Sequence, residues 1–85
     1  SIDGKTTNLL FVVENNKTVV GLVNPQSEAY MKGARVGDEL IEMDSMSISD
    51  FCTFSDMVWK NKDNPYYSLK LLDKSGHIKE MTIKR

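Results

Sequence analysis

The chain has 85 residues, of which 40% are hydrophobic and 27% charged, and its eleven basic and twelve acidic residues leave a net charge of −1. These values predict one globular domain with an adequate core, and they exclude the clearly basic face that nucleic-acid binding needs. The longest apolar run, residues 9–13, is far shorter than the roughly 20 residues of a membrane span, so we expect no membrane insertion. One cysteine, Cys52, excludes an internal disulfide. Because the chain begins Ser-Ile-Asp, we interpret residues 1–85 as a single domain excised from a larger protein.

A β-hairpin is predicted near the start of the chain. Residues 9–13 form a compact apolar run, residues 14–17 are polar turn formers, and residues 18–23 are rich in β-branched side chains. Two such runs around a short polar turn indicate two antiparallel strands. Pro25 then ends the second strand, because proline has no backbone N–H for a sheet.

A short helix and a tight turn follow. Ser27 is a typical N-cap and predicts a helix over residues 27–32. Gly33 lies where a helix end takes a left-handed residue, and Gly37 lies where the chain must reverse. Asp38 is expected to accept backbone N–H bonds and to lock this turn.

The second half of the chain predicts a strand, a helix and a final hairpin. Residues 39–43 indicate the strand. Thr53 and Asp56 resemble a capping box that opens a helix over residues 54–61, although Ser49-Asp50 offers a competing start. Residues 66–72 and 77–84 read as strands around the turn 73–76, which gives about five strands and two helices in all.

The order of residues after the first hairpin carries a more specific pattern. It runs Pro25-x-Ser27-x-Ala29-x-x-x-Gly33-x-x-x-Gly37-Asp38-x-Leu40-Ile41-x-Met43-Asp44. This pattern resembles that of a PDZ domain, and the resemblance extends over nearly the whole chain. It implies an α+β, mostly β fold, a PDZ-like small β-sandwich or partly open barrel of about five to six strands capped by two helices.

The sequence departs from the family pattern at two places. Asp44-Ser45 replaces the usual Asn-Gly turn, so Ser45 must take a conformation that glycine takes more easily. Asn8 and Leu10 replace the two glycines of the carboxylate-binding loop, and of these only Asn8 tolerates a left-handed conformation readily.

The sequence resembles bacterial PDZ domains more than those of animal scaffold proteins. Its linkers are short, and residues 27–51 resemble PDZ modules attached to envelope proteases. The stretch SISDFCTF resembles modules that follow retropepsin-like aspartic proteases. The resemblance therefore implies a linked protease domain as a partner, and a cell-envelope or periplasmic location through the parent protein.

The resemblance also implies a peptide-binding site. PDZ domains bind a C-terminus or an extended strand by adding it to a sheet edge, and a loop of backbone N–H groups holds the terminal carboxylate. In this chain the loop and edge would be formed by Asn8, Leu9, Leu10, Phe11, Val12 and Val13. The second helix would contribute Ser55 or Asp56, Val58 or Trp59, and Cys52.

Each of these residues also has a plainer interpretation. Phe11, Val13 and Val58 are expected to be core residues first, and Trp59 either lines or fills the groove. Cys52 is expected to be a small buried side chain, and the five methionines are expected to serve packing.

An enzyme would need a catalytic constellation, and the sequence contains none. It lacks a Gly-x-Ser-x-Gly elbow, a phosphate-binding Gly-x-x-x-x-Gly-Lys loop and an Asp-Thr-Gly signature, and it has one histidine and one cysteine. We therefore expect no catalysis, no metal and no cofactor in this domain. The alternative function is a structural accessory domain whose groove is closed, which packs on its own protease or mediates oligomerisation.

Overall fold

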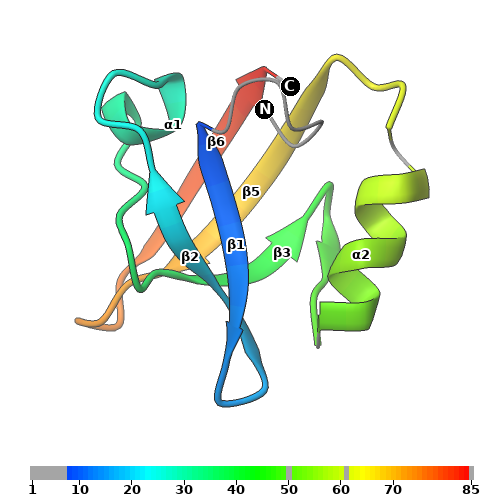
Figure 1. Ribbon diagram of the computed structural model, residues 1–85, viewed down its shortest axis with the longest axis horizontal. Helices are drawn as coiled ribbons and strands as arrows, with labels where there is room; N and C mark the ends of the chain where they lie inside the picture. Colours follow the sequence, from blue (N-terminus) through cyan, green and yellow to red (C-terminus); the bar gives the residue numbers. More distant parts are fainter. Residues whose placement is uncertain (1–7, 50, 61, 85) are drawn as a thin grey trace.

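The computed structural model describes residues 8–49, 51–60 and 62–84. Its six strands form one antiparallel sheet in the order β1-β2-β3-β5-β6, with β4 paired to β3, and the sheet is not closed. In Figure 1 the β1–β2 hairpin passes in front of β5 and β6, while α1 and α2 lie on opposite sides of the hairpin. The elements are β1 (Leu9–Glu14), β2 (Lys17–Val23), α1 (Glu28–Met31), β3 (Glu39–Met43), β4 (Met46–Ser47), α2 (Phe51–Lys60), β5 (Tyr66–Leu72) and β6 (Ile78–Lys84).

The core lies between the two halves of the twisted sheet. Strands β1 and β2 contribute Leu9, Phe11 and Val20, and the other half contributes the remaining large side chains. Alternate residues of β5 and β6 point inward, as the period of two along a strand requires. The buried side chains of these two strands are Tyr67, Leu69, Leu71, Met81 and Ile83.

The first hairpin forms where the sequence predicts it. Asn15 and Asn16 make a two-residue turn with φ of 53° and 63°. Two consecutive left-handed residues match the right-handed twist of the flanking strands, and asparagine tolerates that conformation better than most residues.

The predicted short helix is also confirmed. Ser27 Oγ accepts a hydrogen bond from the Tyr30 N–H at 3.2 Å, which makes Ser27 the N-cap of α1. Glu28 in the first turn accepts from Lys32 Nζ and from the Lys84 N–H, and these bonds hold the pKa of its carboxyl below the ordinary value. The helix is thereby attached to the end of β6.

The turn around Gly37 and Asp38 joins α1 to β3. Gly33 and Gly37 have φ of 109° and 92°, so both left-handed predictions are confirmed. Asp38 is 3% exposed, and its Oδ2 accepts from the Arg35 N–H at 2.9 Å, as expected of a residue that locks the turn. The Gly37 N–H donates to the Val20 carbonyl at 2.8 Å, which docks the turn on β2.

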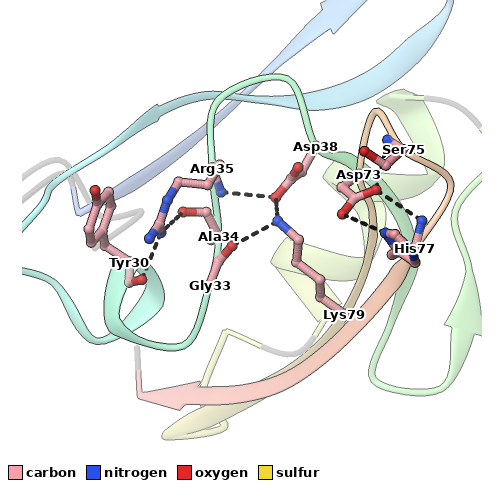
Figure 2. A network of polar contacts seen from close by, with 9 residues as sticks. All are labelled: Tyr30, Gly33, Ala34, Arg35, Asp38, Asp73, Ser75, His77 and Lys79. Carbon is pink, nitrogen blue, oxygen red and sulfur yellow. Dashed lines mark hydrogen bonds and ion pairs between the residues drawn. The ribbon is translucent and has the colours of Figure 1, made fainter.

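A lysine from β6 completes this turn. Lys79 Nζ donates to Asp38 Oδ2 at 2.8 Å and to the Gly33 carbonyl at 2.9 Å (Figure 2). The Arg35 guanidinium lies over the Tyr30 ring, 3.5 Å from its centroid, and caps the carbonyl end of α1. The buried carboxylate therefore connects two segments of the chain that are 41 residues apart.

Figure 2 also shows the tight turn between β5 and β6. Asp73 Oδ1 accepts from the Ser75 and His77 N–H groups, each at 2.9 Å. These bonds, the one from His77 above all, hold the pKa of Asp73 below its ordinary value. The side chain of His77 is exposed, and its Nδ1 lies 3.7 Å from Asp73 Oδ2, so both the backbone and the ring of His77 lie against Asp73.

Three details differ from the sequence predictions. The helix α2 begins at Phe51, so Thr53 is not its N-cap but lies inside the first turns, where its Oγ1 contacts Ser49 Oγ at 3.2 Å. The competing start near Ser49 was the better prediction, although Asp50 lies outside the described residues. The two-residue strand β4 was not predicted, because two residues are too few for a periodic signal.

The expected packing role of the methionines holds only in part. Met43 and Met81 are buried, but Met31 is 75% and Met46 57% exposed. Met31 ends the four-residue helix α1 and Met46 lies next to a turn, so neither reaches the space between the two halves of the sheet.

The turn at Asp44-Ser45 takes the conformation that the missing glycine would favour. Asp44 and Ser45 have φ of 50° and 67°. Asp44 Oδ1 accepts from the Ser68 N–H at 2.9 Å, and the Asp44 N–H donates to the Ser68 carbonyl at the same distance. Attachment to β5 on both sides therefore compensates for the left-handed serine.

We expect Gly37→Val to lower the free energy of unfolding by about 1–3 kcal/mol, because a β-branched residue is strained at φ of 92°. A Cβ at this position would also lie 2.4 Å from Lys74 Cε, which must move aside. Gly76→Val shares the strain, since φ there is 87°, but its Cβ meets no atom within 4 Å, so the difference between the two variants measures the contact with Lys74. Chemical denaturation measures both, and an unchanged midpoint for Gly37→Val would show that the turn tolerates side chains.

Candidate functional site

The strand β1 lies at one end of the strand order, so it presents an edge of the described sheet. Its pairing with β2 is antiparallel and reaches from Glu14, opposite Lys17, to Leu9, opposite Val23. In the part of the chain that the structure describes, no strand pairs with its other side. Exposed strand edges carry unpaired N–H and C=O groups that another chain can bind.

The phase of the hairpin determines which backbone groups face outward. A two-residue turn is closed by a hydrogen-bonded pair, here Glu14 and Lys17, and such pairs alternate with non-bonded ones along the strands. Val13 and Phe11 therefore belong to non-bonded pairs, and their N–H and C=O groups point away from β2. We call the outward-facing backbone of Leu9, Phe11 and Val13 the β1 edge.

A bulge interrupts the hairpin at Gly21. The register shifts between Leu10, opposite Leu22, and Phe11, opposite Val20, so Gly21 has no partner residue on β1. A Cβ on Gly21 would lie 2.7 Å from a Val12 methyl, so only glycine leaves room for the Val12 side chain there. Bulges increase the local twist of a strand pair, and this one lies at the middle of the candidate site.

The predicted edge residues fall into two sets. Leu9 and Phe11 are 2% and 7% exposed and belong to the core, whereas Leu10, Val12 and Val13 are exposed. Phe11 is thus confirmed as a core residue. The same expectation for Val13 is wrong: it is 54% exposed, because it lies near the end of β1, beyond the side chains that cover Phe11.

Asn8 precedes the edge and is tied to the far end of β2. Its carbonyl accepts from the Asn24 N–H at 2.8 Å, and its Oδ1 accepts from Asn24 Nδ2 at 3.2 Å. Both groups therefore extend the hairpin by one more pair. No pattern in the sequence predicts this contact, which follows from the register of the two strands.

The helix α2 packs against β1 through one aromatic contact. The rings of Phe54 and Phe11 meet edge to face with centroids 5.1 Å apart, and Phe54 is 8% exposed. Val58 follows four residues later on the same face of the helix and packs against the core, as expected. This contact fixes α2 beside the candidate site.

Ser55 and Trp59 lie on the exposed flank of α2. Trp59 is 72% exposed, and Lys62 Nζ lies 4.4 Å from the centroid of its ring. A side chain so exposed does not fill a groove. Asp56 is exposed as well, and the side chain of Cys52 lies outside the described part of the structure, so its expected burial stays a prediction.

Two hollows lie in the described part of the surface, and neither is lined by Phe11, Val13 or Trp59. One of about 330 Å³ lies at the turn end of the hairpin, between β2 and the β5–β6 turn. Another of about 190 Å³ lies over β5 and β6. At the β1 edge itself the ring of Phe11 packs against that of Phe54, and the outward N–H and C=O groups can pair with another strand.

The described residues also lack two kinds of structural feature. They contain no group of three or more histidine, cysteine, aspartate or glutamate side chains that could hold a metal ion. Among the helices of residues 8–49, 51–60 and 62–84, none is long and apolar enough to cross a membrane.

Two solved structures share this arrangement of elements. Both are of the PDZ domain of EpsC from Vibrio cholerae, as a shorter and a longer fragment. The shorter fragment aligns with a TM-score of 0.63 at 14% sequence identity, over 91% of this chain and 91% of that chain. The chain has the PDZ fold. The longer fragment agrees, with a TM-score of 0.64 at 15% identity over 91% of this chain and 75% of that chain.

The PDZ fold predicted from the sequence is thereby confirmed, and both matching structures are bacterial. No protein-family model matches the sequence, and the comparison with curated proteins finds no match. The similarity therefore lies in the fold and not in a close sequence match.

Proposed function

We propose that this chain is a protein-interaction module that binds a peptide or protein segment by strand addition along the β1 edge. The observation that carries the proposal is the position of β1, an edge strand with exposed side chains and outward backbone groups beside α2. Strand addition obtains its affinity from main-chain hydrogen bonds, and the PDZ fold is a known setting for it. We propose no catalytic role for the domain itself.

A linked protease is a further part of the proposal. It rests on the resemblance of residues 27–51 to PDZ modules of bacterial envelope proteases, and on that of the stretch SISDFCTF to modules that follow retropepsin-like aspartic proteases. In such a protein the module would select or position segments for the protease. A parent polypeptide without a protease domain would contradict this part and leave the binding proposal unaffected.

The contact between Phe11 and Phe54 favours a second candidate function. These rings pack edge to face between β1 and α2, with centroids 5.1 Å apart, and so take up space that a terminal apolar side chain would otherwise use. A structural accessory domain, which packs on its own protease or mediates oligomerisation, needs no such pocket.

Binding is expected to be weak, with a dissociation constant of about 10 µM or higher, because a short peptide loses conformational freedom on docking. Amide chemical shifts measured with a library of short peptides ending in Val or Leu test this. Shifts that concentrate on residues 9–14 and on α2 support the binding module. Saturating shifts elsewhere contradict the assignment of the site, and no shifts across the library favour the accessory role.

One substitution tests strand addition directly. Val13→Pro removes an N–H that faces the β1 edge but leaves the bonds to β2 in place, so the fold is expected to persist. The best peptide of the library should bind this variant about tenfold more weakly, which corresponds to one lost hydrogen bond of about 1.4 kcal/mol. Val13→Ala is the matched control, because it shortens the same side chain and keeps the N–H. Equal weakening by both would show that the side chain, not the backbone, makes the contact.

A further inference from the structure

The start of β1 is paired strand rather than a turned loop, and the extra residue of the bulge, Gly21, lies on β2. Leu9 pairs with Val23 and Leu10 with Leu22, and the Asn24 N–H donates to the Asn8 carbonyl at 2.8 Å. Burial alternates accordingly, with Leu9 at 2%, Leu10 at 46% and Phe11 at 7% exposed. The sheet thus continues through the segment where a carboxylate-binding loop was expected.

A carboxylate nest needs a different backbone. Successive N–H groups converge on one anion where right-handed and left-handed residues alternate or where the chain turns. Leu9, Leu10 and Phe11 are not among the residues with positive φ, which within the described chain are Gly33, Gly37, Gly76, Asn15, Asn16, Asp44 and Ser45. In a paired strand the N–H groups of neighbouring residues point to opposite sides. The Leu10 N–H therefore faces β2, while those of Leu9 and Phe11 face outward.

The side chain at position 10 keeps the backbone in this state. A leucine takes a left-handed conformation much less readily than the glycine of the expected loop. Leu10 also lies directly across from Leu22, which is 45% exposed, and two positions from Val12, which is 38% exposed. These three side chains form an apolar row on the outer face of the hairpin, and turning Leu10 would break it.

We propose that the β1 edge accepts an internal extended segment of a partner protein and makes no use of a free C-terminal carboxylate. This inference rests on the proposed function, strand addition at the same edge. The segment's alternate side chains lie beside Leu10 and Val12, so the matching chemistry is apolar on that face.

Three forms of one peptide test the need for a carboxylate. The best binder of the peptide library is prepared as the free acid, as the C-terminal amide, and with four further residues at its C-terminus. Titration of the 85-residue chain should give three dissociation constants within about threefold of one another. A free acid that binds tenfold or more tightly than the other two overturns this inference and leaves strand addition intact. If none of the three binds, strand addition itself fails, and the inference falls with it.

A pair of variants tests the apolar row. Leu10→Ser should weaken binding of the amide peptide about three- to tenfold, because Leu10 is on the edge strand and meets the added segment. Leu22→Ser is the matched control: it is equally exposed and lies opposite Leu10, but one strand further from the edge. It should change binding by less than about twofold. Equal effects of both variants would contradict the placement of the segment beside Leu10.

Discussion

Asp38→Asn is expected to lower the free energy of unfolding by about 3 kcal/mol. Removing one partner of a buried ion pair leaves the other without compensation, which typically costs about 3–5 kcal/mol. The lower end applies, because the Lys79 side chain is 24% exposed whereas that of Asp38 is 4% exposed. Asparagine keeps the size of the side chain and an oxygen that can accept from the Arg35 N–H. The loss of stability therefore reports the contribution of the negative charge.

The control for this prediction is the loss of a more exposed ion pair, which Lys70 forms on the surface of the sheet. Lys70 Nζ on β5 lies 3.3 Å from a carboxylate oxygen of Glu42 on β3 and 3.3 Å from one of Glu80 on β6. The hydrogen bond to Glu80, and next in size the one to Glu42, raise the pKa of Lys70. Solvent weakens such pairs, so Glu42→Gln should cost less than about 1 kcal/mol. Denaturant midpoints with unchanged slopes would compare the two variants.

The contribution of Lys79 can be separated by a double-mutant cycle. Lys79→Met keeps the apolar stem of the side chain but removes the ammonium group that faces the buried Asp38 carboxylate. Of the two hydrogen bonds described for that carboxylate, the one from the Arg35 N–H remains. If the two groups act as a pair, the double variant should be more stable than the sum of the two single losses implies. Strict additivity would show that Asp38 stabilises the turn without Lys79.

The local structure of this turn was predictable, but its long-range partner was not. Gly33, Gly37 and Asp38 carry turn signals that depend only on neighbouring residues, and all three behave as the sequence predicts. Lys79 is one of many lysines in the sequence, and nothing local distinguishes it. Its role follows from the register of β6, which places it across from the turn 41 residues away.

The candidate site shows the same division. The apolar run of residues 9–13, the polar turn formers at 14–17 and the β-branched run that follows predicted the hairpin, and the structure confirms it. The bulge at Gly21 and the contact of Phe11 with Phe54 depend on three-dimensional packing, which a single sequence does not encode in any short pattern. The expectation of a turned loop came from the family resemblance, and Leu10 was the residue that already argued against it.

Phe11→Ala is expected to lower the free energy of unfolding by about 3–4 kcal/mol. Large-to-small substitutions of buried aromatic residues typically cost about 3–5 kcal/mol, from lost burial and from the cavity that remains. Phe11 is 7% exposed and loses its edge-to-face contact with Phe54, which contributes about 0.5–1.5 kcal/mol beyond burial. Because small domains are stable by only about 5–15 kcal/mol, Phe11→Leu is measured alongside it and should cost less than about 1.5 kcal/mol.

Val13→Ala provides the matched control on the same face of the same strand. Val13 is 54% exposed and lies two residues after Phe11, so its truncation should change stability by less than about 0.5 kcal/mol. The contrast between the two variants measures where α2 stops covering β1. If Val13→Ala costs as much as Phe11→Ala, the helix covers the whole strand and the β1 edge is closed to a partner. If Phe11→Ala is nearly neutral, the ring does not hold α2 in place, and α2 is free to move away from the edge when a segment binds.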